Sequence, residues 1–313
     1  MAFQFHQQTG ASRRTRFATL SGAYHGDTVG AVSVGAIPLF HEVYRPLLFQ
    51  CVVLPAPRTA GGEEEAECLA QALTMLEEHG ETLAALVMEP LCQGAAGLKM
   101  HSPEFARTLA QRARDLGVLV VFDEVAVGFG RTGSMFATEI VGITPDFLCL
   151  AKGLSGGYLP LAATLTTTWI YDAFLGPFDA WRQLFHGHTF TGNPLACAVA
   201  LASLDRFEHV HLLDHVREVS KTLADGVARL VDPHVFATRQ LGLMVGIDLQ
   251  RRDGTPYAPA DRAGHRAAME TRQHGAIVRP LGDTLVLNPP LAITHDEVNH
   301  LMNAVSLGLR ALP

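Results

Sequence analysis

The sequence is short of cysteine, and the few cysteines it has are not arranged for disulfides or a redox motif. It contains five, which are scattered along the chain and form no C-x-x-C pair: Cys51, Cys68, Cys92, Cys149 and Cys197. Unpaired cysteines of this kind are typical of reduced compartments, where they behave as small apolar residues. We therefore expect a cytoplasmic protein whose cysteines contribute to the core.

The sequence also lacks basic blocks and long apolar runs. Lysine and arginine number 24 against 31 acidic residues, which gives a net charge of -7, so we expect no nucleic-acid partner. No apolar run reaches the roughly 18 residues of a membrane helix, so we expect no membrane association. The opening segment, MAFQFHQQTG, has neither the charged region nor the apolar region of a signal peptide.

What is present favours a compact α/β enzyme. The chain has 313 residues, of which 48% are hydrophobic and 18% charged, enough for a large domain and a smaller one. Short apolar runs alternate with amphipathic helical segments, which predicts a mostly parallel, doubly wound sheet covered on both faces. The expected strands are Arg16–Leu20, Cys51–Leu54, Leu83–Met88, Val118–Phe122, Asp146–Leu150 and Leu161–Thr166.

The second part of the chain has a different pattern. Long helical stretches run from about residue 193 to residue 232, and Phe236–Leu249, Ala276–Arg279 and Thr284–Leu287 are expected to be strands. A final helix begins at the capping box that starts with Thr294. We therefore predict a large domain over residues 1–205, and a connecting helix with a small α+β domain over residues 206–313.

Lysine is scarce, and one lysine stands in an unusual place. Lys99 lies in a loop and Lys221 in a charged helical stretch, whereas Lys152 ends an apolar strand and opens the turn Gly-Leu-Ser-Gly-Gly. Burial at such a place lowers the pKa of an amine, and a neutral amine can attack an aldehyde to form a Schiff base. An ordinary strand-end lysine that extends to solvent explains the same pattern equally well.

Two carboxylates follow a second buried strand. Asp123 and Glu124 end the run Val-Leu-Val-Val-Phe, and ligands of open α/β sheets bind at the carboxyl ends of strands. A carboxylate there can hold a metal, act as a base, pair with a heterocyclic nitrogen, or only cap the next turn. Pyridoxal phosphate (PLP) needs the third of these roles, because a carboxylate keeps its pyridine nitrogen protonated.

Three further segments carry candidate binding residues. In Ser-Gly-Ala-Tyr24-His-Gly-Asp-Thr, an aromatic side chain in a glycine-flanked loop can stack on a flat cofactor. The segment His-Gly-His-Thr-Phe-Thr-Gly-Asn-Pro opens a helix, where hydroxyl and N–H groups suit a phosphate. Arg279 follows an apolar run and can clamp a carboxylate.

Two other patterns suggest sites that we do not favour. Gly128–Gly133 matches the dinucleotide motif G-x-G-x-x-G, but five residues separate it from the strand and no apolar helix follows directly. His211 and His215 are spaced i, i+4, with His209 nearby, but their surroundings are those of a charged, solvated helix. We expect no metal site.

Taken together, the ordered segments resemble the class III aminotransferases, which have the type I fold of PLP enzymes. The resemblance lies in YHGDTVGAVSVG, VMEPLCQGAAG, VVFDEVAVGFGRTG, PDFLCLAKGLSGGYLP and HGHTFTGNPLACAVA, and it continues in RQLGLMVGIDL. Ornithine- and GABA-type members usually carry glutamine where this chain has Ala126. The chain is more similar to the members of biotin biosynthesis, which aminate 8-amino-7-oxononanoate with S-adenosylmethionine or lysine as donor. HGHTFTGN is similar to the branch that uses lysine.

The resemblance implies a role for each candidate residue. Lys152 would carry PLP as a Schiff base and move the proton between substrate and cofactor, and Asp123 would pair with the pyridinium. Tyr24 would lie over the ring, with His25 as a further cofactor contact. Thr189 would reach the phosphate of the neighbouring subunit in a homodimer with shared active sites.

The resemblance also implies how substrate is held and where this chain departs from the family. Arg279 would hold the substrate carboxylate, and Asp27, Gly187 and Tyr24 would contact substrate. Relatives carry a further N-terminal segment with a Gly-Ser turn that grips the cofactor phosphate, which leads us to expect an N-terminally truncated fold. The alternatives are an ω-amino-acid aminotransferase of ornithine or GABA type, and a non-catalytic remnant that binds PLP weakly or a partner.

Overall fold

The computed structural model describes residues 1–313, which divide into two compact units. Unit 1 comprises Met1–Gln93, Met100–Gly128 and Phe136–Asp205, and unit 2 comprises Gly94–Lys99, Phe129–Met135 and Arg206–Pro313. The chain therefore passes between the units several times before its last crossing after Asp205. The sequence did not predict the two short excursions into unit 2.

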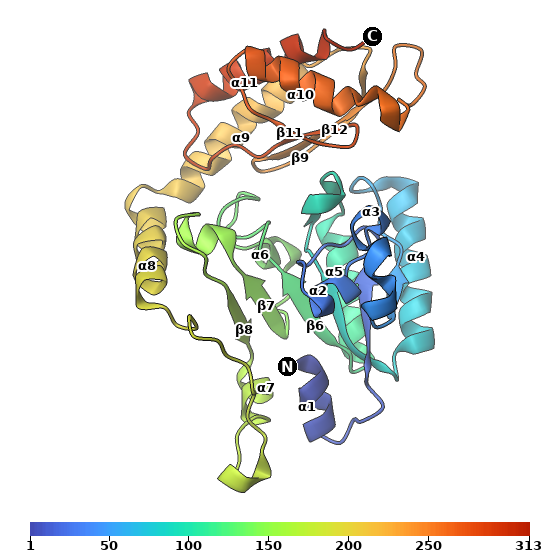
Figure 1. Ribbon diagram of the computed structural model, residues 1–313, viewed down its shortest axis with the longest axis vertical. Coiled ribbons are helices and arrows are strands. Elements are labelled where there is room, and N and C mark those ends of the chain that lie inside the picture. The colour runs from blue at the N-terminus through green and yellow to red at the C-terminus, as the bar shows by residue number, and fades with distance from the viewer. The chain divides into compact units, whose positions relative to one another are not determined.

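Unit 1 is built on a six-stranded sheet in the order β2-β1-β3-β6-β7-β8 (Figure 1). Its strands are β1 (Arg16–Leu20), β2 (Cys51–Leu54), β3 (Leu83–Met88), β6 (Leu119–Asp123), β7 (Phe147–Leu150) and β8 (Ala163–Thr166). All neighbours pair in parallel except β7 and β8. The predicted mostly parallel α/β fold is confirmed, with strand ends within two residues of those expected.

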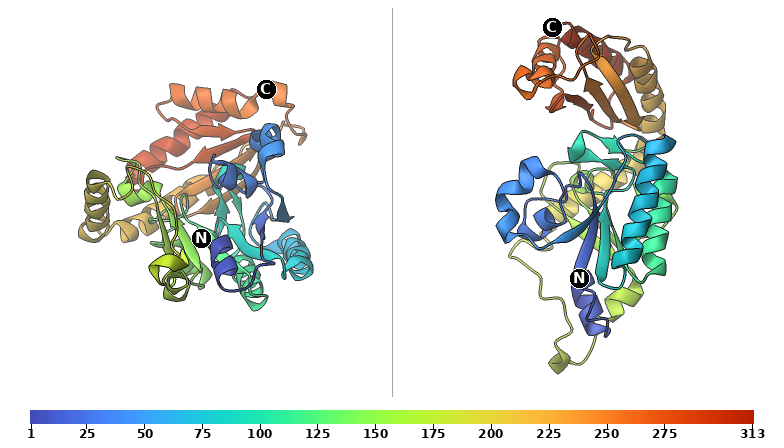
Figure 2. Two further views of the ribbon diagram at one scale, coloured as in Figure 1. Left: turned by 60° about the horizontal axis from the view of Figure 1, so that its bottom comes forward. Right: turned by 90° about the vertical axis from the view of Figure 1, so that its right-hand side faces the viewer.

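Helices pack against this sheet along their apolar stripes. The right-hand view of Figure 2 shows α4 (Gly62–His79) and α5 (Pro103–Asp115) on one side of the strands. Helix α5 begins where the sequence indicated, because the Ser102 hydroxyl accepts a hydrogen bond from the Phe105 N–H at 3.0 Å. The short α1 (Ala2–Gln8) buries Ala2 and Phe5 against strand residues that include Ala85 and Leu119.

The remaining elements of unit 1 are short. They are α2 (Val29–Ser33), α3 (Pro38–His41), η1 (Glu42–Leu47), β4 (Cys92–Gln93), α6 (Ala137–Val141), η3 (Lys152–Ser155), α7 (Thr168–Asp172) and η4 (Phe178–Ala180). Helix α8 (Pro194–His209) carries the chain out of unit 1. The single turn η2 (Gly94–Ala96) belongs to the first excursion, and β5 (Lys99–Met100) spans the point where the chain returns to unit 1. No helix of the protein is long and apolar enough to span a membrane.

Unit 2 is a four-stranded antiparallel sheet with helices. Its strands follow the order β11-β12-β10-β9. Its elements are α9 (Leu212–Ala228), β9 (Val235–Leu241), β10 (Met244–Leu249), η5 (Pro259–Asp261), α10 (Ala263–Gln273), β11 (Arg279–Leu281), β12 (Thr284–Leu287) and α11 (His295–Leu309). Helix α11 begins at the predicted capping box. The Thr294 hydroxyl accepts a hydrogen bond from the Glu297 N–H, and the Glu297 carboxylate accepts one from the Thr294 N–H.

Two details of unit 2 differ from the sequence-based expectation. The strand expected at Ala276–Arg279 is wrong, because strand β11 begins only at Arg279, where pairing with β12 starts. The long helical stretch is interrupted near His211, which has a left-handed φ of 48° and stands before α9. A residue whose backbone has this conformation does not continue a right-handed helix.

Candidate active site

Three segments of unit 1 leave the sheet at the same edge. Strands β1, β6 and β7 point in one direction, because parallel pairing links β1 to β3, β3 to β6 and β6 to β7. The loop with Tyr24 and His25 follows β1, Asp123 ends β6, and Lys152 comes two residues after β7. The parallel topology therefore gathers the predicted site at the carboxyl edge of the sheet.

A buried ion pair forms the centre of this edge. The Oδ2 atom of Asp123 lies 2.8 Å from Nδ1 of His25, and only 11% of the Asp123 side chain and 5% of the His25 side chain are exposed. Oδ1 of Asp123 accepts a second hydrogen bond from the Val125 N–H at 3.0 Å. These two contacts fix the position of the carboxylate.

The other ring nitrogen of His25 has no partner. Its Nε2 atom is buried and makes no hydrogen bond in the structure. A buried polar atom without a partner costs about 1–3 kcal/mol, which singles this ring out as a group that can face a ligand.

Lys152 has a strained backbone and a free side chain. Its φ is 42°, in the left-handed region that a lysine seldom adopts, and it opens the single turn η3. Such a conformation costs on the order of 1–3 kcal/mol and occurs preferentially at functional sites. The side chain is exposed and its Nζ forms no hydrogen bond or ion pair, so the burial that we expected from the sequence is absent.

Lys152 lines a cavity of about 1640 Å³ that extends over one face of the sheet. Phe17 of β1, Val121 of β6 and Cys149 of β7 line this cavity too. Its volume exceeds the range of about 300–1,000 Å³ that is usual for small-molecule sites. The cavity can therefore take a flat cofactor together with a substrate or a further piece of polypeptide.

Cys149 is a cavity residue that the sequence argument missed. It stands opposite Asp123 in the parallel register of β6 and β7. The two-residue period of strands offered the only signal, since Cys149 has the parity of the cavity-lining Phe147 and Ala151. Burial raises the pKa of its thiol to about 11, so the group stays protonated at neutral pH.

Glu124 has a structural place beside the site. Its two carboxylate oxygens accept hydrogen bonds from the N–H groups of Ala137 and Thr138, both at 2.7 Å, at the start of α6. The residue is fully buried, and this burial raises its pKa to about 7. Glu124 therefore fixes the loop between β6 and α6.

Tyr24 and Asp27 form a pair within the loop after β1. The Tyr24 hydroxyl donates to Oδ2 of Asp27 at 3.0 Å. Partial burial, with the adjacent Asp27 carboxylate, raises the pKa of the phenol. The Tyr24 ring is half-buried and lies nearly parallel to the ring of His41, with 6.3 Å between centroids.

The structure leaves other predicted residues apart from this centre. Thr189 and Gly187 are exposed and do not line the cavity, whereas His186 and His188 of the same loop do. Arg279 is exposed and belongs to unit 2. The sequence motif located this loop correctly at the start of a helix but did not distinguish which of its side chains face the cavity.

The two patterns that we did not favour have structural explanations. Gly128–Gly133 forms a tight turn region before α6, with no helix starting at its last glycine. His215 uses Nε2 to contact the carbonyl of Ile293 at 2.9 Å, which fastens α9 within unit 2. No group of three histidine, cysteine or acidic side chains is arranged to hold a metal ion.

Comparison with known proteins links this edge to a chemistry. The aminotransferase class-III family model matches residues 1–309. The adenosylmethionine-8-amino-7-oxononanoate aminotransferase of Nitratidesulfovibrio vulgaris is 50% identical over 97% of this chain, which spans 58% of that protein. The protein of the same name from Geobacter sulfurreducens is 45% identical over the whole chain, which spans 71% of that relative.

Solved structures agree with these relatives. The protein of that name from Methanocaldococcus jannaschii superposes with a TM-score of 0.94 at 39% identity, over 99% of this chain and 71% of its own. A PLP-bound amine transaminase from an uncultivated Pseudomonas species gives 0.92 at 35% identity, over 100% of this chain and 73% of its own. The matching sheet, its carboxyl-edge lysine and acid, and the family model over residues 1–309 place this chain in the class-III aminotransferase family.

Proposed function

We propose that this protein transfers an amino group to 8-amino-7-oxononanoate to give 7,8-diaminononanoate, a step of biotin biosynthesis, with PLP as cofactor. The observation that carries the proposal is the buried His25–Asp123 pair, at the same sheet edge as the unpaired amine of Lys152. The relatives named above, at 45–50% identity, support the choice of substrate.

The residues at this edge fit PLP. Asp123 offers a buried carboxylate, held by His25 and Val125, which suits a protonated pyridine nitrogen. The Nε2 atom of His25 has no partner and can contact the cofactor. The cavity lined by Lys152 is large enough for the cofactor ring. Bound PLP supplies an electron sink that stabilises negative charge on the substrate carbon.

The side chains of this chain would hold and move the protons. The Lys152 amine would hold the cofactor covalently and would take and return a proton at the substrate carbon. Asp123, which is positioned by the 2.8 Å contact with Nδ1 of His25, would accept a hydrogen bond from the pyridine nitrogen of the cofactor. The amino group would pass from the donor to the enzyme in one half-reaction and from the enzyme to the acceptor in the next, which predicts ping-pong kinetics.

Four residues are the candidates for holding the substrate. We assign its carboxylate to Arg279, whose guanidinium can form a two-pronged contact, and its polar groups to Tyr24, Asp27 and Gly187. The hydrogen bond from the Tyr24 hydroxyl to Asp27 supports the assignment of that pair, because it orients both groups. S-adenosylmethionine is the donor named for the relatives, and lysine is the alternative.

We also propose that the protein is a cytoplasmic homodimer with shared active sites. The segment between α7 and α8 exposes large apolar side chains: Leu175 by 51%, Phe178 by 83%, Trp181 by 59%, Phe185 by 72% and Phe190 by 71%. Monomeric proteins seldom expose contiguous patches of this kind. A second copy covering this segment brings Thr189 to the partner's cofactor phosphate, and light scattering would show twice the 33.7 kDa of one chain.

The proposal is tested on the purified chain with added PLP. Wild-type protein should develop a visible absorption band at roughly 400–430 nm that Lys152→Ala lacks. It should then aminate 8-amino-7-oxononanoate, with the faster of the two donors identifying the physiological one. A band without this activity but with ornithine or GABA turnover identifies the other ω-amino-acid class. If the band is absent, the proposal that this chain is catalytic is wrong, and the alternative of a non-catalytic binding protein is supported.

A further inference from the structure

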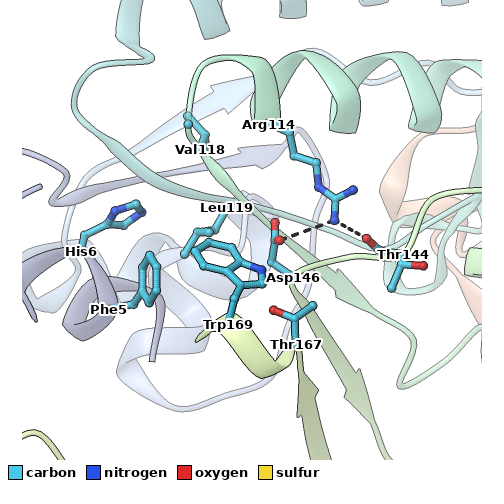
Figure 3. A pocket seen from close by; sticks show the side chains of 10 residues that line it. Phe5, His6, Arg114, Val118, Leu119, Thr144, Asp146, Thr167 and Trp169 are labelled. Atoms are coloured by element: carbon cyan, nitrogen blue, oxygen red, sulfur yellow. Dashed lines mark hydrogen bonds and ion pairs between the residues drawn. The ribbon is translucent and has the colours of Figure 1, made fainter. Parts of the chain in front are cut away.

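Unit 1 has a second cavity, of about 450 Å³, at the opposite edge of its sheet (Figure 3). Leu119, the first residue of β6, and Asp146, which directly precedes β7, both line it. Because parallel strands run one way, their starts lie at the far edge from Asp123 and Lys152. The volume falls within the usual range of small-molecule sites, about 300–1,000 Å³.

Arg114 supplies hydrogen-bond donors to this cavity. Its Nη2 donates to the Thr144 carbonyl and lies 3.5 Å from Oδ1 of Asp146, as the dashed lines in Figure 3 mark. Its Nε and Nη1 groups make no hydrogen bond in the structure, and 31% of the side chain is exposed. A guanidinium with unused N–H groups is suited to a planar carboxylate.

A second polar group in the cavity lacks a partner. The hydroxyl oxygen of Thr167 is buried from solvent and forms no hydrogen bond, although Thr167 precedes α7 and such a residue usually caps its helix. A buried hydroxyl without a hydrogen-bond partner lowers the stability of the fold. A ligand that bonds to this hydroxyl would remove that cost.

The apolar wall of the cavity is aromatic. The Trp169 indole meets the Phe5 ring edge to face, with 4.8 Å between centroids and 88° between planes. Figure 3 shows the indole between Phe5 and Asp146, below the guanidinium of Arg114. Trp169 is 52% exposed, so a ring can lie against it.

One ionisable side chain of the cavity lining has hydrogen-bond donors left for a ligand. Asp146 is engaged on both oxygens, because Oδ2 accepts the Val120 N–H at 2.7 Å and Oδ1 faces Arg114. His6 is neutral near pH 7, because burial lowers its pKa, and its Nε2 is bonded to the Ala84 carbonyl at 2.9 Å. Arg114 is therefore the only charged group of the cavity with free bonding capacity.

From this arrangement we propose that unit 1 carries a second small-molecule site, specific for an aromatic carboxylate. The carboxylate binds the free N–H groups of Arg114, the ring lies against Trp169, and the Thr167 hydroxyl bonds to an oxygen of the ligand. The site is independent of the cofactor, because none of its residues lies at the carboxyl edge of the sheet.

Benzoate is a suitable probe, with neutral benzamide as its matched control. The chain has two tryptophans, so Trp181→Phe makes Trp169 the sole indole reporter. Benzoate should change the fluorescence of this variant saturably in the millimolar range, with benzamide at least tenfold weaker. Arg114→Met in the same background should abolish the response. No saturable change, equal binding of benzamide, or an unaffected Arg114→Met variant overturns the proposal.

Thr167→Val separates a ligand contact from a structural role. Valine fills the same volume without the unsatisfied hydroxyl, so the protein alone should melt at an equal or higher temperature while benzoate binds at least threefold more weakly. A loss of thermal stability with unchanged benzoate affinity would show that the hydroxyl serves the fold, and would contradict its part in the site. These readouts require neither PLP nor turnover.

Discussion

At the residue scale, the candidate site contains two buried acidic residues that are adjacent in the sequence and make different contacts. Asp123 is positioned by contacts with Nδ1 of His25 and with the Val125 N–H at the carboxyl end of β6. Glu124 is turned the other way, bonded to Ala137 and Thr138 and isolated from solvent. Asp123 is the last residue of β6 and Glu124 is the first residue after it, so one dipeptide supplies both a carboxylate at the sheet edge and an anchor for the following loop.

The pKa of Glu124 predicts a pH dependence of stability. Burial raises that pKa from 4.5 to about 7, so the folded state binds the proton more tightly than the unfolded state. The free energy of unfolding should therefore be highest below pH 4.5 and fall as the pH rises to about 7, by on the order of 3 kcal/mol from this group. Urea unfolding across this range should show the slope.

Glu124→Gln provides the control, because its amide does not titrate. We expect the variant to be less stable than wild type, since an NH₂ group faces one of the two backbone N–H donors. The contribution of residue 124 to the pH slope should disappear. An unchanged slope would assign the titration to another group.

His25 is expected to act through Asp123. His25→Leu removes the donor to Oδ2 of Asp123 and leaves that carboxylate with the Val125 N–H alone. A hydrogen bond to a charged group contributes about 1.5–3 kcal/mol, so PLP should bind roughly 10- to 100-fold more weakly. PLP titration measures this, and His25→Gln, which keeps a donor, should recover part of the affinity. Equal affinity in all three proteins would contradict the role.

At the scale of elements, strands were predicted well where burial alone defines them. The strands of unit 1 are nearly continuous apolar runs, because parallel strands are buried on both faces. Strand β11 was misplaced because Ile277, although apolar, is 81% exposed, while pairing with β12 begins at Arg279. Its bounds depend on the turn at Gly282, whose φ of 60° allows the chain to reverse.

The cap of α5 gives a prediction at this scale. Ser102→Ala removes the side-chain acceptor for the Phe105 N–H and should lower the free energy of unfolding by about 1 kcal/mol. Ser220→Ala is the matched control, because Ser220 lies inside α9, where alanine is the better helix former, and should be neutral or slightly stabilising. Chemical denaturation of both variants measures the difference, and equal effects would refute a capping role.

At the scale of the whole molecule, unit 2 is assembled from three separate pieces of chain. The excursion Gly94–Lys99 is fastened by Arg239, whose guanidinium donates to the carbonyls of Gly97 and Leu98. Arg239 is also paired with Asp248 at 2.6 Å, with both side chains at most 5% exposed. A single buried cation thus joins a distant segment to the antiparallel sheet.

Arg239→Met should accordingly destabilise the protein strongly. It leaves Asp248 as a buried charge without its guanidinium, which costs about 3–5 kcal/mol. Lys221→Met, which breaks an exposed pair with Glu218, should change the free energy of unfolding by less than about 1 kcal/mol. Calorimetry compares the two, and a small loss for Arg239→Met would show that Asp248 is readily accommodated by other partners.

The sequence by itself determined the strands of unit 1, the caps at Ser102 and Thr294, and the places of Lys152 and Asp123 at strand ends. These features depend on local pattern, namely apolar runs, capping residues and strand-end polar groups. The tertiary structure decided the His25–Asp123 pair, the exposure of Lys152, the place of Cys149 in the cavity and the excursions held by Arg239. Such features depend on which segments the fold brings together, over separations of 98 residues between His25 and Asp123 and of 142 residues between Gly97 and Arg239.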